Sequence, residues 1–107
     1  MARPQDEILA SIRRRLGNPP KQRNELLLAL YEAAVAKFHA LTRLPRVPAK
    51  ARPLLVEMVV VAYNRVKSEG LHSQSLHGAA ESYLDGLPDD LTAAIMACKP
   101  KKLKVLG

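Results

Sequence analysis

The sequence has few of the residues that build disulfide frameworks or aromatic cores. Its one cysteine, Cys98, excludes a disulfide within the chain and indicates a reducing compartment, or one without a disulfide framework. There is no tryptophan, and aromatic residues make up 4% of the chain. The core must therefore be built from Leu, Val, Ile and Ala, which favours helices.

Long hydrophobic runs are also missing. The longest, residues 54–63, is interrupted by Glu57 and is roughly half the ~20 residues that a membrane-spanning helix needs. The first residues lack the apolar core of a signal peptide. We therefore expect a soluble protein that is made in the cytoplasm and has no membrane partner.

The charge of the chain is uneven. The net charge is +7, and residues 1–54 carry eleven basic and four acidic residues, whereas residues 55–107 carry six of each. A basic excess attracts nucleic acids and acidic protein surfaces alike, and a merely solvated surface is the other interpretation. With 107 residues, 48% of them hydrophobic, the chain fits one folded domain.

Apolar spacing predicts an all-α fold, a small bundle of about four helices. Asn24 is expected to cap the second helix, and Pro88 with the two aspartates after it starts the fourth. A long loop without core residues is expected at residues 70–86, between the third and fourth helices, and a basic, extended tail at residues 99–107. The expected helices span residues 5–16, 23–44, 49–68 and 88–97, and residues 1–20 form the N-terminal helix and linker.

The third expected helix is apolar on nearly every side, and its β-branched run also fits a buried strand. A helix that is apolar all round must be covered all round, and three other short helices are too few to do so. This predicts a second subunit. The interface candidates on this helix are Val56, Val60 and Tyr63.

No combination of residues predicts catalysis, a metal or a cofactor. His72 and His77 lack the further ligands that a zinc site needs, and Cys98 with a distant histidine is not specific for a nucleophile. The serines lack a G-x-S-x-G context, the glycines form no phosphate-binding pattern, and the aspartates have the wrong spacing for a calcium loop. We expect a protein that is not an enzyme.

Nucleic-acid binding is the alternative that the charge supports. Arg13, Arg14 and Arg15 are consecutive, so on a helix they point in different directions and cannot all face one strand of DNA. No helix-turn-helix pattern is present. The alternative is therefore a small basic, non-enzymatic nucleic-acid-binding protein without sequence reading.

The order of features over residues 23–104 resembles the head–tail connector family of tailed bacteriophages, which are adaptor or head-completion proteins. The order is a helix pair joined by a short proline-bearing link, then the segment VVVAYNRVKSEGLHSQS, and then the segment ESYLDGLPDDL. The positions that carry it are Tyr63, Asn64 and Arg65; Glu69, Gly70 and Leu71; Ser73 and Ser75; and Leu87, Pro88, Asp89 and Asp90.

The resemblance implies a helical virion protein without enzymatic activity, assembled in the host bacterial cytoplasm. Its members form a homo-oligomeric ring of about a dozen subunits beneath the portal protein. The ring prolongs the DNA channel, lets the genome pass without specific contacts, and supports the next neck or tail-completion protein.

Two segments are candidates for partner contacts, the loop from its own length and composition and the tail from the resemblance. The long polar loop suits a segment that lines the channel or faces a neighbour, with Leu71, His72, Ser73, Gln74 and Ser75 as candidates. The tail would engage the portal or neighbouring subunits, and its alternating pattern also fits an added strand on a partner's sheet or a frayed terminus. The tail candidates are Lys99, Lys101, Lys102, Leu103, Lys104, Val105 and Leu106.

Overall fold

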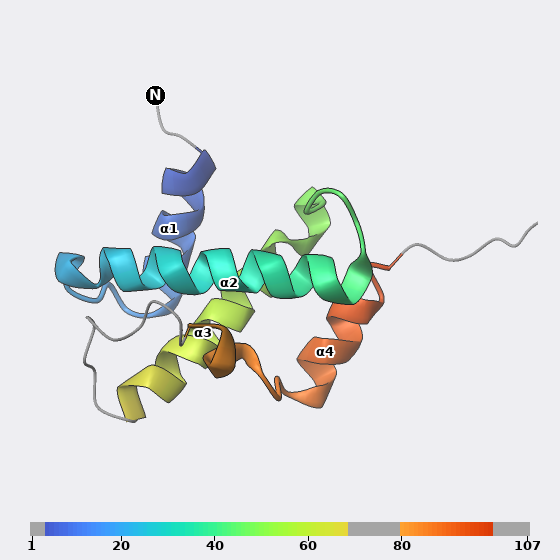
Figure 1. The fold of residues 1–107 in the computed structure, drawn as a ribbon. Helices are drawn as coiled ribbons and strands as arrows, with labels where there is room; N and C mark the ends of the chain where they lie inside the picture. The colour runs from blue at the N-terminus through green and yellow to red at the C-terminus, as the bar shows by residue number, and fades with distance from the viewer. Residues whose placement is uncertain (1–3, 69–79, 100–107) are drawn as a thin grey trace, which may run out of the picture.

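The computed structural model describes residues 4–68 and 80–99 of the chain, and throughout these ranges the regular structure is helical (Figure 1). The expected all-α fold with four α-helices is confirmed. The elements in order are α1 (Pro4–Arg15), η1 (Lys21–Arg23), α2 (Asn24–Thr42), η2 (Ala49–Ala51), α3 (Arg52–Ser68), η4 (Ala80–Leu84) and α4 (Asp89–Met96), where η marks a 3-10 helix.

The long helix α2 organises the bundle. It packs along α3, and α1 and α4 lie near its opposite ends (Figure 1). Leucine, valine, isoleucine and alanine supply most of the core, and Phe38 is the largest fully buried side chain. Other fully buried side chains come from every α-helix and from η4: Ile12, Leu27, Leu30, Leu55, Met58, Val59, Leu84 and Ile95.

The end of α1 follows from its sequence. Gly17 and Asn18 both have left-handed backbone, with φ of 77° and 56°. The N–H of Asn18 donates to the carbonyl of Arg13 at 2.8 Å, and the N–H of Gly17 donates to the carbonyl of Arg14 at 3.3 Å. This pair of bonds is the Schellman motif, which satisfies the last carbonyls of a helix and turns the chain away.

The start of α2 differs from the prediction. Arg23, rather than Asn24, precedes the helix, and no side chain caps it. The backbone of Arg23 is already helical because η1 runs directly into α2, so the extended conformation that a capping residue needs is missing. The Asn24 side chain instead accepts a hydrogen bond from Nη1 of Arg13 at 2.7 Å, which ties α1 to α2.

The apolar helix α3 is covered largely by its own chain. It packs against α1, α2, η4 and α4, which explains why so short a bundle can bury it. Val56 and Tyr63 keep only 7% and 5% of their surface exposed, so they offer little area to a second subunit. Val60 is partly buried and keeps more. The need to cover α3 is therefore no argument for a partner.

The connection before α4 contributes to the core, contrary to the expectation that it lacks core residues. Ala80 and Leu84 of η4 are buried, and so is Leu87 just before α4. Their spacing of four and three residues is helical, which is the signal that the polar composition around them hides. The loop candidates at residues 71–75 and the tail candidates beyond Lys99 lie outside the described residues, and Lys99 itself is exposed.

The link between α2 and α3 begins with a left-handed arginine. Arg43 has φ of 60°, and its N–H donates to the carbonyl of His39 at 2.7 Å. The buried Thr42 hydroxyl donates to the Phe38 carbonyl at 2.8 Å, and Nδ1 of His39 donates to the Leu44 carbonyl at 2.7 Å. The chain therefore leaves α2 in one direction, set by hydrogen bonds on both sides of Arg43.

Replacing Arg43 with glycine is expected to stabilise the fold. Glycine adopts this backbone without the clash of a Cβ, and the gain exceeds the entropy that glycine adds to the unfolded chain. We expect the free energy of unfolding to rise by about 0.5–1 kcal/mol, measured by urea denaturation. Arg46→Gly is the control, since Arg46 has an ordinary negative φ; equal losses of stability in both variants would contradict the assignment.

Candidate functional site

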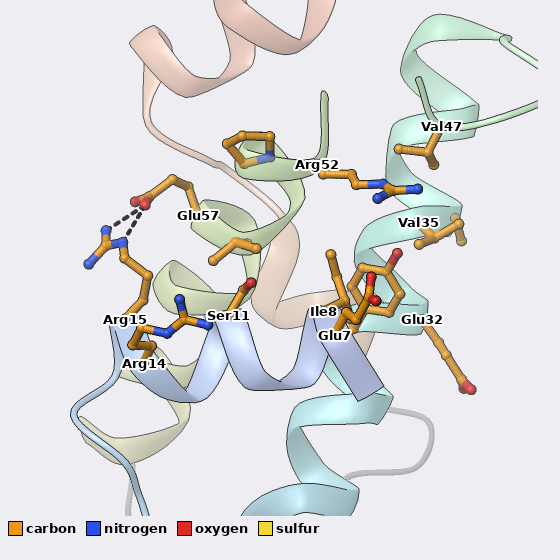
Figure 2. A pocket seen from close by; sticks show the side chains of 14 residues that line it. Glu7, Ile8, Ser11, Arg14, Arg15, Glu32, Val35, Val47, Arg52 and Glu57 are labelled. Atoms are coloured by element: carbon orange, nitrogen blue, oxygen red, sulfur yellow. Dashed lines mark hydrogen bonds and ion pairs between the residues drawn. The ribbon is translucent and has the colours of Figure 1, made fainter. Parts of the chain in front are cut away.

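A groove of about 1080 Å³ lies between α1, α2 and α3 (Figure 2). Its floor is apolar and its rim is charged. The apolar lining includes Ile8, Val35, Val47, Pro53 and Val56, and the charged lining consists of Glu7, Arg14, Arg15, Glu32, Arg52 and Glu57, with Tyr31 between them.

Helical spacing explains why these side chains meet. On α1 the lining residues Glu7, Ser11 and Arg14 recur every three or four positions and so share one face. Tyr31 and Val35 do the same on α2. The two pairs 52–53 and 56–57 line the groove from successive turns of α3. Three helices thus each present one face to the same space.

One ion pair bridges the groove's wall from α1 to α3. Nη2 and Nε of Arg15 lie 2.5 Å and 2.7 Å from the same carboxylate oxygen, Oε2 of Glu57 (Figure 2). Both side chains are about half exposed, so water and salt screen the pair. It contributes less than about 1 kcal/mol to stability, and its main effect is to set where the two helices stand.

Two other arginines of the rim have no acidic partner among the described residues. Arg14 and Arg52 form no ion pair there, although each lines the groove. Arg52 extends across the groove towards α2 (Figure 2). Burial raises the pKa of the nearby Tyr31 phenol, and the positive charge of Arg52 opposes that rise. Tyr31 therefore stays neutral at physiological pH.

The rim is electrically polarised along α1. Glu7, in the first turn, and Glu32 lie towards one end of the groove, and Arg14 and Arg15, in the last turn, lie at the other (Figure 2). Arg52 extends to the acidic side and Glu57 pairs with Arg15 on the basic side, so each end keeps an excess of one charge. This arrangement complements the dipole of α1, which favours acids at its start and bases at its end. An apolar floor between an acidic and a basic end suits contact with an amphipathic surface that carries the opposite polarity.

A second feature joins the end of α3 to the turn before α4, the two described parts of the sequence pattern that runs from Tyr63 to Asp90. Nη1 of Arg65 on α3 donates to the carbonyls of Tyr83 and Asp85, at 3.1 Å and 2.5 Å, and Nη2 donates to the carbonyl of Gly86 at 2.8 Å. The guanidinium thus donates hydrogen bonds to three carbonyls at and just after the end of η4. Gly86 has φ of 63°, which lets the chain turn there towards α4.

An ion pair reinforces the same turn. Nζ of Lys37 on α2 lies 3.7 Å from Oδ1 of Asp85. Because α2 and α3 both reach residues 83–86, the position of α4 is coupled to the two central helices. We call this turn, residues 83–86 with Arg65, the Arg65 clamp.

The candidate residues that the sequence suggested lie in different parts of the structure. Of the three subunit-interface candidates, only Val56 lines the groove, and it does so with its small exposed area. His39 lies at the boundary of the core, with its ring at an edge-on angle of 76° to Phe38. Within residues 4–68 and 80–99, no three His, Cys, Asp or Glu side chains are close enough to share a metal ion.

Sequence reasoning missed the groove residues Glu7, Tyr31 and Arg52. The polar spacing on α1 signals a common face, but no local pattern indicates that this face stands beside α2 and α3. Searches against protein-family models, curated proteins and solved structures find no match to this chain. In the described part of the chain, no helix has the length and apolar character to cross a membrane.

Proposed function

We propose that this protein is a non-enzymatic structural virion protein, a head–tail connector that forms a ring under the portal. In this role it extends the DNA channel and joins the capsid to the next neck or tail-completion protein. The observation that carries the proposal is the ordered pattern from Tyr63 to Asp90, together with the Arg65 clamp that brings its two halves into contact.

The clamp supports the proposal because it gives the pattern a structural reason. Arg65 at the end of the Tyr-Asn-Arg segment holds the turn from which Leu87, Pro88 and the two aspartates start α4. The described ends of the pattern, residues 63–68 and 83–90, are thus joined by direct contacts. An all-α bundle is also the architecture that the resemblance implies.

The arrangement of surfaces also suits a ring. A ring needs two different surfaces on each subunit, so that one contact repeats until it closes. The groove is lined by residues of α1, α2, α3 and the link before α3, and by none of α4, so the groove and α4 are such a pair. The tail from Lys99 onward and the loop at residues 71–75 remain the predicted contacts with the portal, the channel or neighbouring subunits.

The test uses the full chain and the portal protein encoded in the same phage or prophage genome. Electron microscopy of the mixture is expected to show a ring of about a dozen subunits on the portal, with co-sedimentation of the two proteins. The chain alone serves as the control. Failure to bind the portal, by both methods and at high protein concentration, would contradict the proposal.

The net charge of +7 favours one other candidate, a small basic nucleic-acid-binding protein. Its signature is affinity for a DNA duplex that falls steeply as salt rises, because bound arginines and lysines release counterions from the phosphates. Absence of binding at low salt excludes it.

A further inference from the structure

We infer that the groove between α1, α2 and α3 receives the exposed face of α4 from a second copy of this chain. The inference rests on the proposed ring and identifies the two surfaces that would form its repeating contact. It follows from the apolar surface, the charges and the positions of the two elements.

The outer face of α4 is the apolar surface that the fold leaves uncovered. Met96 is 39% exposed, and it is the one large hydrophobic side chain that stands exposed in the described part of the chain. Ala93 and Ala97 are exposed beside it at helical spacing, while Ile95 points into the core. Small residues around a protruding methionine allow another surface to approach α4 closely.

The groove offers the matching shape and chemistry. Its lining includes Val35, Val47 and Val56, which present an apolar floor from two helices and the link between them. Side-chain ridges of one helix pack into the grooves on a neighbouring helix, and an amphipathic helix in an apolar groove is a recurrent mode of recognition. Met96, flanked by alanines, supplies such a ridge.

The charges of α4 run in the same order as those along α1, acidic at the start and basic at the end. Asp89 and Asp90 stand exposed at the start of α4, and neither forms an ion pair with a described residue. Lys99 stands exposed just after its end. An α4 laid antiparallel to α1 therefore places its aspartates beside Arg14 and its lysine beside Glu7.

The lengths of the two elements also agree. Glu7 and Arg14 are about 10 Å apart along the axis of α1, and α4 with its final turn, from Asp89 to Lys99, spans about 15 Å, a difference that the long arginine, lysine and glutamate side chains can bridge. The antiparallel arrangement further sets the two helix dipoles in opposition, which is favourable. The unpaired Arg14 of the rim thus acquires an acidic partner.

A chain cannot fill its own groove, because α1 and α4 lie near opposite ends of α2 (Figure 1). The contact must come from another copy, whose own groove then stays open for a third. Such a head-to-tail contact propagates and closes into a ring when its rotation allows.

Two charge-reversed variants test the contact without a change in net charge. The groove variant carries Glu7→Lys and Arg14→Glu, and the helix variant carries Asp89→Lys and Lys99→Glu. All four residues are exposed, so both variants are expected to keep the wild-type helical circular dichroism spectrum. Analytical ultracentrifugation of each variant alone should show at least tenfold weaker self-association than the wild type.

An equimolar mixture of the two variants is expected to recover the self-association of the wild type. In the mixture, each groove meets an α4 of opposite polarity, whereas within either variant alone the charges repel. A ring built from the mixture alternates the two chains and so contains an even number of subunits. Combining all four changes in one chain should also restore self-association.

Disulfide trapping adds a test that detects weak contacts. With Cys98→Ser as background, a chain with Ser11→Cys, in the groove, is mixed with a chain carrying Ala93→Cys, on α4, and oxidised. A covalent heterodimer is expected. Ala10→Cys replaces Ser11→Cys in the control, because Ala10 is exposed beside the groove and does not line it.

The outcomes separate this inference from the proposed function. Wild-type rings that form equally well from either variant alone would overturn the contact and leave the ring intact. A chain that binds the portal but neither self-associates nor gives the trapped heterodimer would also overturn the contact. A groove variant that keeps self-association but loses portal binding would assign the groove to the portal instead.

Discussion

Replacing Leu84 with alanine is expected to lower the free energy of unfolding by about 2–4 kcal/mol. Leu84 is 1% exposed and lies in η4, where it packs against α2 and α3. Truncation removes buried methyl groups and leaves a cavity that the surrounding helices fill only in part. Because a domain of this size is stable by only about 5–15 kcal/mol, the loss should be obvious in urea or thermal denaturation.

Met96→Ala is the matched control for Leu84→Ala. It also truncates a large apolar side chain, but at an exposed position of α4, so we expect a change within about 0.5 kcal/mol. A Leu84→Ala protein as stable as the Met96→Ala protein would show that η4 is a surface segment. The sequence-based prediction of a loop without core residues would then stand for residues 80–84 as well.

Replacing Arg65 with alanine is expected to lower the free energy of unfolding by about 2 kcal/mol. The variant leaves the carbonyls of Tyr83, Asp85 and Gly86 without their charged donor. Water satisfies part of this loss, since the side chain is only partly buried. Hydrogen exchange should locate the effect, with protection falling in α4 and at residues 83–87 before it falls in α2.

Two variants control the Arg65 experiment. Arg65→Lys keeps the charge but replaces the planar fork with a single ammonium, which cannot reach all three carbonyls in the same way, so only part of the stability returns. Lys67→Ala removes a neighbouring cation whose Nζ stands 6.0 Å from the centre of the Tyr63 ring, and its effect should be about 0.5 kcal/mol or less. Equal effects at positions 65 and 67 would contradict the Arg65 clamp.

The clamp bears on assembly as well as on stability. The proposed contact uses the outer face of α4, and α4 is held in place by Arg65 and by the Lys37–Asp85 ion pair. A loosened clamp should therefore weaken self-association even where the bundle stays folded. The lining of the groove does not include Arg65.

The α-helices were largely predictable because their signals are local. Gly17 and Asn18 end α1 through a Schellman motif, and Pro88 followed by two aspartates starts α4. The helix over residues 49–68 was expected from a pattern that also fits a strand, and the structure shows α3 there, preceded by η2. Helix-forming periodicity and capping involve residues within one or two turns, so the sequence contains both partners of each interaction.

The partners of single side chains were not predictable. Asn24 is a residue type that commonly caps helices, yet its side chain accepts a hydrogen bond from Arg13, eleven residues earlier. Arg65 belongs to a local sequence pattern, but its three acceptors lie 18 to 21 residues further on. Such pairs depend on how whole helices cross, and a change in crossing would replace one partner with another without altering any local signal.

The sequence by itself determined that this protein is a helical bundle and where its helices begin and end to within a few residues. Only the tertiary structure decided that α3 is covered within its own chain, that Leu84 belongs to the core, and that α1, α2 and α3 enclose a polarised groove. The physical reason is range. Periodicity and caps act between neighbours in the chain, whereas burial and grooves arise from packing between segments whose distance in the sequence carries no information about their contact.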